Sequence, residues 1–298
     1  MQKIPLFILA GIDQGDNFGK KRTSELKFKG KLLLDYLIFE AKKSNCFSEI
    51  YLVAERETKE KLSENCFLIE AKKRLWKNIK NVFLFVKNKY INEKSLIAIL
   101  LSDILPSAEE IKDVFLKSEA YLDRDLILMI TPSDNLEKRR GKMFVKKDEQ
   151  SSAIAYSGTG GLYFLRPGHL NTKLIFTMLS LRMPREIRHI EIDENRIYCD
   201  AFRNLKGVIL FFWLITRIIF CSLFFIDKIF LFARTFIKLR KEELTIEKSE
   251  YWLSKIFVKK KYQSKKRASL KVEIIENSVF VDDIDREEDL KLLDTLQK

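Results

Sequence analysis

Two segments of the chain combine residue types that could bind an anionic ligand. Residues 11–30 are loop-like and rich in Gly, Asp, Lys and Ser, and they follow directly on the apolar run at 4–10. Asp103 follows a second apolar run, 95–101, within the sequence Ser-Asp-Ile-Leu-Pro. The formal net charge of +13 favours anionic partners: nucleotides, nucleic acid or an acidic membrane surface. These two segments are therefore the first candidates for a ligand site.

The surrounding elements predict that the two segments meet in space. Short continuous apolar runs, which are typical of buried parallel strands, stand at residues 4–10, 50–54 and 95–101. Apolar residues at helical spacing lie between them, at 32–41 and around 75–79. This alternation predicts a layered α/β domain with a mostly parallel sheet. Ligands bind beyond the carboxyl ends of the strands in such sheets, where the loop at 11–30 and Asp103 both fall.

Further elements are expected downstream of Asp103. A helix is predicted to begin near Ser107, because Glu109 and Glu110 stand in the following turn. Residues 126–131 are a strand candidate. The Gly-rich residues 157–161 are predicted to form a flexible turn before the apolar run at 162–165.

Cysteine and histidine usage argues against a zinc site. The four cysteines are scattered without a CxxC pair, and the chain has two histidines. Reduced, buried thiols in a cytoplasmic protein are the simpler expectation. The short apolar run at 4–10 leads at once into a Gly- and Asp-containing loop, which is not typical of a signal peptide. A cytoplasmic location is expected, with peripheral contact at the inner face of the membrane as an option.

A long apolar stretch changes the character of the chain after residue 204. Residues 207–226 are about long enough to span a bilayer, but Arg217 stands in their middle. Lys206, Arg217 and Lys228 are spaced by eleven, so they lie nearly on one line of a helix. Such a narrow polar stripe suits a helix at an anionic membrane surface or on a protein partner, through 207–236. Ordinary buried helices and a spanning helix remain the alternatives.

Four short segments, in order along the chain, resemble motifs of the MobA-like nucleotidyltransferases. They are Leu9-Ala10-Gly11 with Gly30-Lys31-Leu32-Leu33, then residues 101–106, 157–164 and 283–290. The resemblance implies a Rossmann-like, GT-A-like fold with three α/β/α layers. It also implies transfer of a nucleotidyl group from a nucleoside triphosphate to a phosphorylated small-molecule acceptor, with release of pyrophosphate.

The resemblance further implies roles for individual residues. A Gly-containing loop offers backbone N–H groups to a triphosphate, and Mg²⁺ suits a site with few carboxylates and several phosphate oxygens. The nucleotide-binding residues would be Leu9, Ala10, Gly11, Arg22, Lys27 and Asn78. The acceptor would contact Arg140, Gly160 and Gly161. Asp103 would be catalytic and would hold Mg²⁺ together with Asp283 and Asp285.

The position of the closing acidic motif bears on the domain organisation. Because that motif follows the apolar stretch, residues 1–204 and 265–298 are expected to form one α/β domain. Residues 205–264 would be an apolar, then basic, helical insertion. A single membrane crossing would separate the motif from the nucleotide loop, so the insertion is expected to lie in the membrane plane, to form a hairpin or to pack on protein.

Other functions remain open beside nucleotidyl transfer. Ile12, Thr23 and Leu162 depart from the family pattern, which keeps open a catalytically diverged, membrane-associated nucleotide-binding or scaffold protein on the same fold. A sugar-nucleotide glycosyltransferase is a third candidate. Nucleic acid is a less favoured partner, because few aromatic residues interleave the basic run at 255–271.

Overall fold

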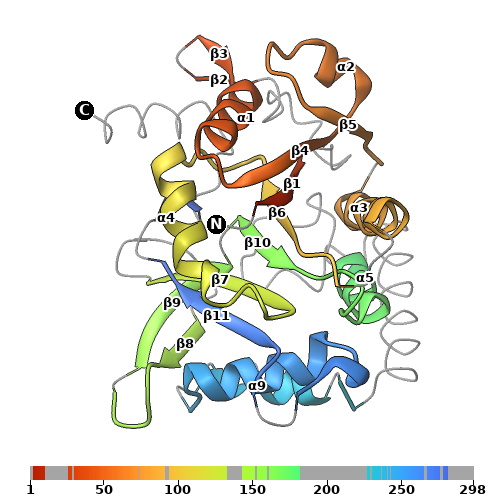
Figure 1. Ribbon diagram of the computed structural model, residues 1–298. Helices are drawn as coiled ribbons and strands as arrows, with labels where there is room; N and C mark the ends of the chain where they lie inside the picture. The colour runs from red at the N-terminus through yellow and green to blue at the C-terminus, as the bar shows by residue number, and fades with distance from the viewer. Residues whose placement is uncertain are drawn as a thin grey trace, which may run out of the picture.

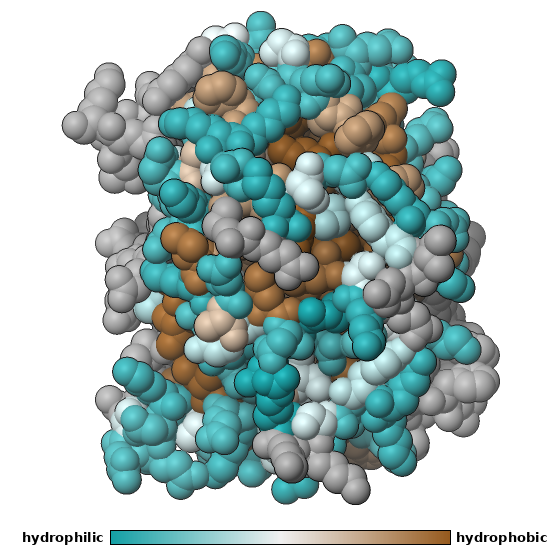
Figure 2. Space-filling view, in the orientation of Figure 1, coloured by the Kyte–Doolittle hydropathy of each residue, from teal (hydrophilic) through white to brown (hydrophobic). Residues whose placement is uncertain are grey.

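The computed structural model describes a sheet flanked by helices (Figure 1). The described residues are 3–10, 26–28, 30–72, 74–90, 94–132, 143–151, 153–159, 161–181, 227–228, 230–235, 237–239, 241, 243–264, 267–275 and 278–280. Figure 2 shows one surface of the molecule, which is mostly hydrophilic, with apolar side chains gathered in its middle.

Nine described strands form the main sheet. They are β1 (Ile4–Leu9), β4 (Phe47–Ala54), β5 (Phe67–Glu70), β6 (Ile97–Leu101), β7 (Leu126–Pro132), β8 (Met143–Lys146), β9 (Ala153–Thr159), β10 (Leu162–Leu165) and β11 (Leu270–Ile274). Their order is β5-β4-β1-β6-β10-β7-β9-β8, with β11 paired to β7. The pairs β5–β4, β4–β1, β1–β6 and β7–β11 are parallel, whereas β10 runs antiparallel to both β6 and β7.

Helices cover both faces of this sheet. Helices α1 (Leu33–Lys43) and α4 (Ala108–Glu119) lie on one face, and α3 (Leu75–Tyr90), α5 (Thr172–Leu181) and α9 (Ile246–Phe257) lie on the other (Figure 1). The smaller described elements are the β2–β3 hairpin (Lys27–Phe28 and Lys31–Leu32), α2 (Arg56–Glu60), η3 (Lys260–Tyr262) and η4 (Ser278–Phe280). The pairs β7–β9 and β8–β9 are also antiparallel, so the sheet is mixed, with its β5-β4-β1-β6 part parallel. The predicted three-layer α/β/α architecture is therefore confirmed.

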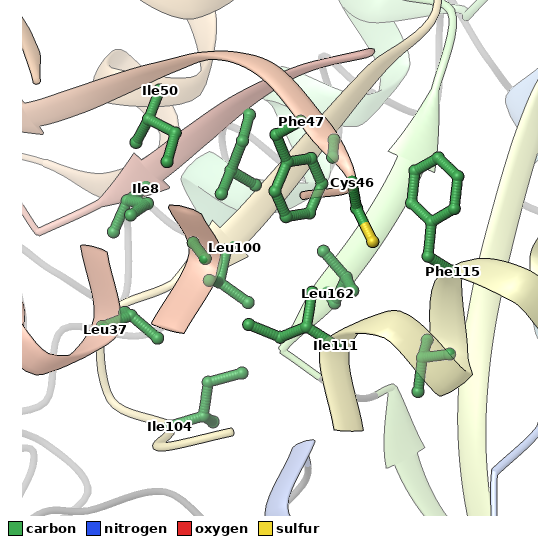
Figure 3. Packing of buried hydrophobic residues seen from close by; sticks show 14 of the residues in the cluster. Ile8, Leu37, Cys46, Phe47, Ile50, Leu100, Ile104, Ile111, Phe115 and Leu162 are labelled. Atoms are coloured by element: carbon green, nitrogen blue, oxygen red, sulfur yellow. The ribbon is translucent and has the colours of Figure 1, made fainter. Parts of the chain in front are cut away.

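Burial on both faces explains the continuous apolar runs. In β1, Ile4, Leu6 and Ile8 belong to the core beneath α1 and α4, while Phe7 and Leu9 belong to the opposite core. Successive side chains of a strand point to opposite faces, so a strand with a helix layer on each side has no polar positions. Figure 3 shows the first of these cores, in which Ile8, Leu100 and Leu162 meet side chains of α1 and α4.

The strands predicted at 4–10, 50–54 and 95–101 are confirmed, as is the helix predicted near Ser107. Ser107 Oγ accepts the backbone N–H of Glu110 at 3.3 Å, and Glu110 Oε2 accepts the N–H of Ser107 at 2.7 Å. This reciprocal capping box satisfies two helix-end donors at the start of α4.

The flexible turn predicted at 157–161 is wrong over residues 157–159. These residues belong to β9, and their backbone pairs with β7, whereas β8 pairs with residues 153–156 of the same strand. Pairing with β7 outweighs the local preference of a Gly-containing sequence for turns.

The C-terminal part of the chain returns to the sheet. β11 adds to β7 in parallel, and α9 packs beside it. Residues 230–235 and 237–239 are helical, with Thr235 and Leu239 buried. No helix among the described residues is both long and apolar enough to cross a membrane. Residues 207–226 lie outside the described part, so the division into a domain and an insertion stays a prediction.

Candidate functional site

The carboxyl ends of β1 and β6 lie side by side. These strands pair in parallel with Leu9 opposite Leu101, and Ser102 donates its N–H to the carbonyl of Leu9 at 3.2 Å. Ala10 donates its N–H to Val53 of β4 at 2.9 Å. The ends of β1 and β6, from which the N-terminal loop and the Asp103 segment start, therefore lie together, while residues 11–25 of the loop lie outside the described residues.

A third segment closes on the same edge at Gly161. Its carbonyl accepts the N–H of Leu101 at 2.8 Å, and its own N–H donates to the carbonyl of Phe280. A Cβ on Gly161 would stand 2.6 Å from Cδ1 of Ile104, which is closer than side-chain atoms approach one another. Glycine is therefore what allows β10 to begin against the loop that carries Asp103.

Phe280 brings the C-terminal segment to this edge. Its side chain is fully buried in the core that also holds Ile104 and Leu162. Together with its hydrogen bond to Gly161, this burial fixes the chain three residues before Asp283. Asp283 and Asp285 themselves lie outside the described residues.

The β2–β3 hairpin places Lys27 next to the same loop. Leu26 and Phe28 are buried in a small cluster with Leu105, two residues after Asp103, whereas Lys27 is exposed. The hairpin turns at Gly30, whose φ of +80° is a conformation that glycine adopts without strain. This turn explains the glycine that precedes α1.

Asn78 stands at the same edge but farther along the sheet. It lies in the first turn of α3, and its buried Oδ1 accepts the N–H of Lys72 at 2.5 Å. Its Nδ2 has no hydrogen-bond partner within the described part of the chain. Lys72 follows β5, which β4 separates from β1 in the sheet. A contact with nucleotide stays a prediction, with Nδ2 as the atom that would make it.

The remaining predicted site residues lie outside the described residues. They are Gly11, Arg22, Arg140 and Gly160, together with Asp283 and Asp285. Of the predicted set, the structure therefore brings together Leu9, Ala10, Asp103 and Gly161, with Lys27 close by and Asn78 at the same edge.

Asp103 is the carboxylate that the described edge offers to a metal. It is half-buried at the end of β6. Two buried acids of α1 already bind backbone: Asp35 accepts the N–H of Glu64 at 2.9 Å, and Glu40 accepts that of Ala108 at 2.7 Å. The described residues contain no group of three His, Cys, Asp or Glu that could hold a metal ion. Mg²⁺ is usually bound by one or two carboxylates, and its other ligands are water and phosphate oxygens. A site with Asp103 as its carboxylate would fit this coordination.

Two features escaped the sequence reasoning. One is an apolar cavity behind the site, built from elements far apart in the chain. The other is a buried pair, His169 Nδ1 at 2.6 Å from Asp125 Oδ1, with the Tyr262 ring stacked on the imidazole. Asp125 precedes β7, so this pair lies at the opposite edge of the sheet from Asp103. No spacing in the sequence signals either feature.

The fold places the chain among three-layer α/β/α proteins of the Rossmann-like class. No protein-family model and no curated protein matches its sequence. A hypothetical transferase from Thermus thermophilus matches with a TM-score of 0.54 at 13% identity, over 97% of this chain and 100% of that one. This TM-score supports a shared fold, and an identity of 13% leaves the activity open.

Two further solved structures match more distantly. A 4-diphosphocytidyl-2C-methyl-D-erythritol synthase from Anaerococcus prevotii has a TM-score of 0.45 at 13% identity, over 100% of this chain and 99% of that one. A CMP:2-keto-3-deoxy-manno-octonic acid synthetase complexed with CTP has a TM-score of 0.43 at 10% identity, over 64% and 83%. These scores are too low to add weight to the fold assignment.

Proposed function

We propose that the chain is a Mg²⁺-dependent nucleotidyltransferase that moves a nucleoside monophosphate from a nucleoside triphosphate to a phosphorylated acceptor. The supporting observation is the meeting of Ala10, Asp103 and Gly161 at the carboxyl edge of β1 and β6. Parallel α/β sheets bind their ligands at this edge. The order of the four sequence motifs that resemble the MobA-like family supports the same reaction.

The loop after Ala10 would bind the triphosphate through its backbone N–H groups, as Gly-containing loops do. Arg22 and the exposed Lys27 would offset its charge, and Asn78 would contact the base or ribose through Nδ2. Arg140, Gly160 and Gly161 would bind the acceptor.

Asp103 would hold the metal, together with Asp283 or Asp285. The anchoring of Phe280 on Gly161 supports this assignment, because it leaves both acids three to five residues from the edge where Asp103 lies. Mg²⁺, when bound, would neutralise charge that develops on the α-phosphate. The chain's own part is to position the acceptor oxygen for in-line attack and to exclude unproductive geometries.

One observation favours the alternative of a catalytically diverged nucleotide-binding or scaffold protein. Leu162 stands where the family branch carries an asparagine, and its side chain is fully buried among Ile104 and Phe280. It therefore offers no polar contact to an acceptor.

The experiment is Mg²⁺-dependent pyrophosphate release with the four ribonucleoside triphosphates and a panel of phosphorylated acceptors. We expect Asp103→Asn to lower the rate about a hundredfold or more, because it removes charge that stabilises the transition state. The matched control is Asp113→Asn on α4, whose exposed side chain pairs with Lys117 at 2.9 Å. It should keep the wild-type rate.

The outcomes separate the candidates. Nucleotide binding without turnover on any acceptor would favour the diverged protein. If no nucleoside triphosphate binds, both nucleotide functions are wrong.

We also propose that the chain associates peripherally with an anionic membrane surface. Phe230 and Ile237 are 71% and 53% exposed, and Arg234 is exposed on the same face of this helical segment. Arg234 also lies over the Trp252 ring, at 5.3 Å from its centroid. Apolar and basic side chains on one helix face are typical of interfacial helices.

A further inference from the structure

A large apolar cavity lies directly behind the candidate site. Its volume is about 540 Å³, and it stands between the sheet and the layer formed by α3, α5, α9 and residues 232–239. Side chains from six strands line its floor, among them Ile99, Leu128 and Val272. Leu253 and Phe257 of α9 close the opposite side. A partly open apolar space of this size falls within the range of volumes that ligand-binding pockets show.

The lining admits hydrocarbon and disfavours a polar ligand. The hydroxyl groups of the lining belong to Tyr163, Thr235 and Ser249. Thr235 donates to the carbonyl of Leu231 at 2.7 Å and Ser249 to that of Thr245 at 2.8 Å, each within its own helix. A polar group moved into such a lining would lose its hydrogen bonds to water, which costs free energy. The transfer of a hydrocarbon chain from water into the same lining lowers the free energy.

One end of the cavity coincides with the candidate site. Leu9 and Leu101, the last residues of β1 and β6, both line it, as do Leu75 and Ile79 in the first turns of α3. The residues that follow Leu9 and Leu101 lead into Ala10 and Asp103. A molecule whose apolar part contacts these leucines would therefore bring its other end to the edge proposed for nucleotide binding.

The helical residues 230–235 and 237–239 cover the cavity with one face and are exposed on the other. Phe232, Thr235 and Leu239 line the cavity, whereas Phe230 and Ile237 point outward. The outward face carries the chemistry of an anionic membrane interface. An apolar cavity beneath such a face fits a ligand that is drawn from a lipid surface.

We propose that the cavity binds the hydrocarbon chain of a single-chain or isoprenoid monophosphate, whose phosphate lies at the carboxyl edge of β1 and β6. A methylene group is close to a water molecule in size, about 30 Å³, so a volume of about 540 Å³ has room for on the order of 18 chain carbons. The inference rests on the proposed nucleotidyl transfer, because it identifies the phosphorylated acceptor as an amphiphile.

The transfer to such an acceptor balances without a further reactant. An oxygen of the lipid phosphate forms a bond to the α-phosphorus of the nucleoside triphosphate, and the bond from that phosphorus to the oxygen bridging to the β-phosphate breaks. Pyrophosphate leaves with the electron pair. The product is a nucleoside diphosphate carrying the lipid chain, and no proton is required because the acceptor phosphate is largely ionised near neutral pH.

The test compares dodecyl phosphate with butyl phosphate by titration calorimetry, in the absence of nucleotide and below the micelle-forming concentration. Each methylene buried in the cavity should tighten binding about threefold to fourfold. We expect dodecyl phosphate to bind the full chain at least about a hundredfold more tightly than butyl phosphate. Equal affinities would overturn the proposal.

Cavity-filling variants locate the binding. Leu128→Trp and, separately, Leu253→Trp place an indole in the space and should reduce the chain-length gain at least tenfold. The matched control is Leu116→Trp, at an exposed position of α4 on the other side of the sheet. Melting curves identify any variant that fails to fold, and the comparison of two chain lengths on the wild type needs no variant. An unchanged gain in both folded variants would overturn the proposal.

Failure of this inference is distinguishable from failure of the proposed function. If nucleoside triphosphates bind and the chain-length gain is absent, the lipid acceptor is wrong and nucleotidyl transfer stands. If the gain is present and no nucleoside triphosphate binds, the hydrocarbon site stands, but the acceptor role and the transfer reaction are wrong.

Discussion

Gly161 is the residue at which the candidate site depends most on the absence of a side chain. It links Leu101 of β6 to Phe280 through its two backbone groups, and Ile104 packs directly over it. The residues proposed for chemistry are thus held by backbone contacts among three segments. In the proposed function Asp103 would act through its side chain, whereas Gly161 lets the segments meet because it has none.

Gly161→Ala should destabilise the fold by about 1–3 kcal/mol, because its Cβ would overlap Cδ1 of the buried Ile104. In an Ile104→Val background that atom is missing, so the same substitution should cost less. Urea unfolding of the four proteins in this double-mutant cycle measures the difference. The same cost in both backgrounds would mean that the contact with Ile104 is not the cause.

At the scale of elements, polar contacts hold the C-terminal end of α3 against the beginning of β4. Glu49 of β4 accepts hydrogen bonds from Lys89 Nζ at 2.7 Å and from Tyr90 OH at 2.7 Å. The hydrogen bond from Lys89, with that from Tyr90, lowers the pKa of Glu49 below its usual range. Because α3 also carries Asn78, this cluster helps to orient the helix whose first turn faces the candidate site.

Glu49→Gln should lower the free energy of unfolding at pH 7 by less than about 1 kcal/mol, since the pair is partly exposed. A carboxylate with a lowered pKa stabilises the folded state above its unfolded pKa of about 4.3. This contribution is lost as pH falls through the folded pKa. The difference between wild type and Glu49→Gln in urea unfolding should therefore shrink between pH 7 and about pH 3. Glu60→Gln, exposed on α2, is the control and should show no such trend.

The sequence predicted the elements best where a strand is buried on both faces. β1, β4 and β6 are continuous apolar runs for that reason, and their parallel arrangement puts Ala10 and Asp103 at one edge. β11 was not predicted, although its sequence Leu-Lys-Val-Glu-Ile alternates apolar and polar residues as a half-buried strand does. It directly follows a strongly basic run, and its partner β7 lies more than a hundred residues earlier in the chain.

The contacts that complete the candidate site were beyond the sequence. Gly161 and Phe280 are joined across more than a hundred residues, and the cavity combines side chains from β1 to β11. Such contacts depend on how helix layers pack over the sheet, and residue type or local spacing does not record that packing.

At the scale of the whole molecule, the two faces of the sheet differ. The core beneath α1 and α4 is filled by closely packed apolar and aromatic side chains (Figure 3), whereas the opposite layer encloses the cavity. The layer over the cavity includes the helical residues 230–235 and 237–239, whose outward face is apolar and basic. One face of the molecule would then serve stability and the other would serve a lipid ligand and a membrane surface.

Wild-type protein should pellet with vesicles that contain phosphatidylserine and should remain in the supernatant with phosphatidylcholine vesicles. Replacing both exposed side chains, Phe230→Ser with Ile237→Ser, should weaken partitioning at least about tenfold, because it removes apolar area that would enter the interface. Leu84→Ser, at an exposed leucine of α3, is the matched control. Equal sedimentation of all three proteins would remove the membrane association from the account.

The central claim is that a nucleoside triphosphate binds at the carboxyl edge of β1 and β6. Hydrogen–deuterium exchange with Mg²⁺ and each ribonucleoside triphosphate tests it directly. We predict slower exchange in peptides that contain Ala10, Ser102–Asp103 and Gly161, with no change around Asp125 and His169 at the opposite edge. Unchanged exchange at Ala10 and Asp103 with all four nucleotides, or protection confined to the opposite edge, would contradict the account.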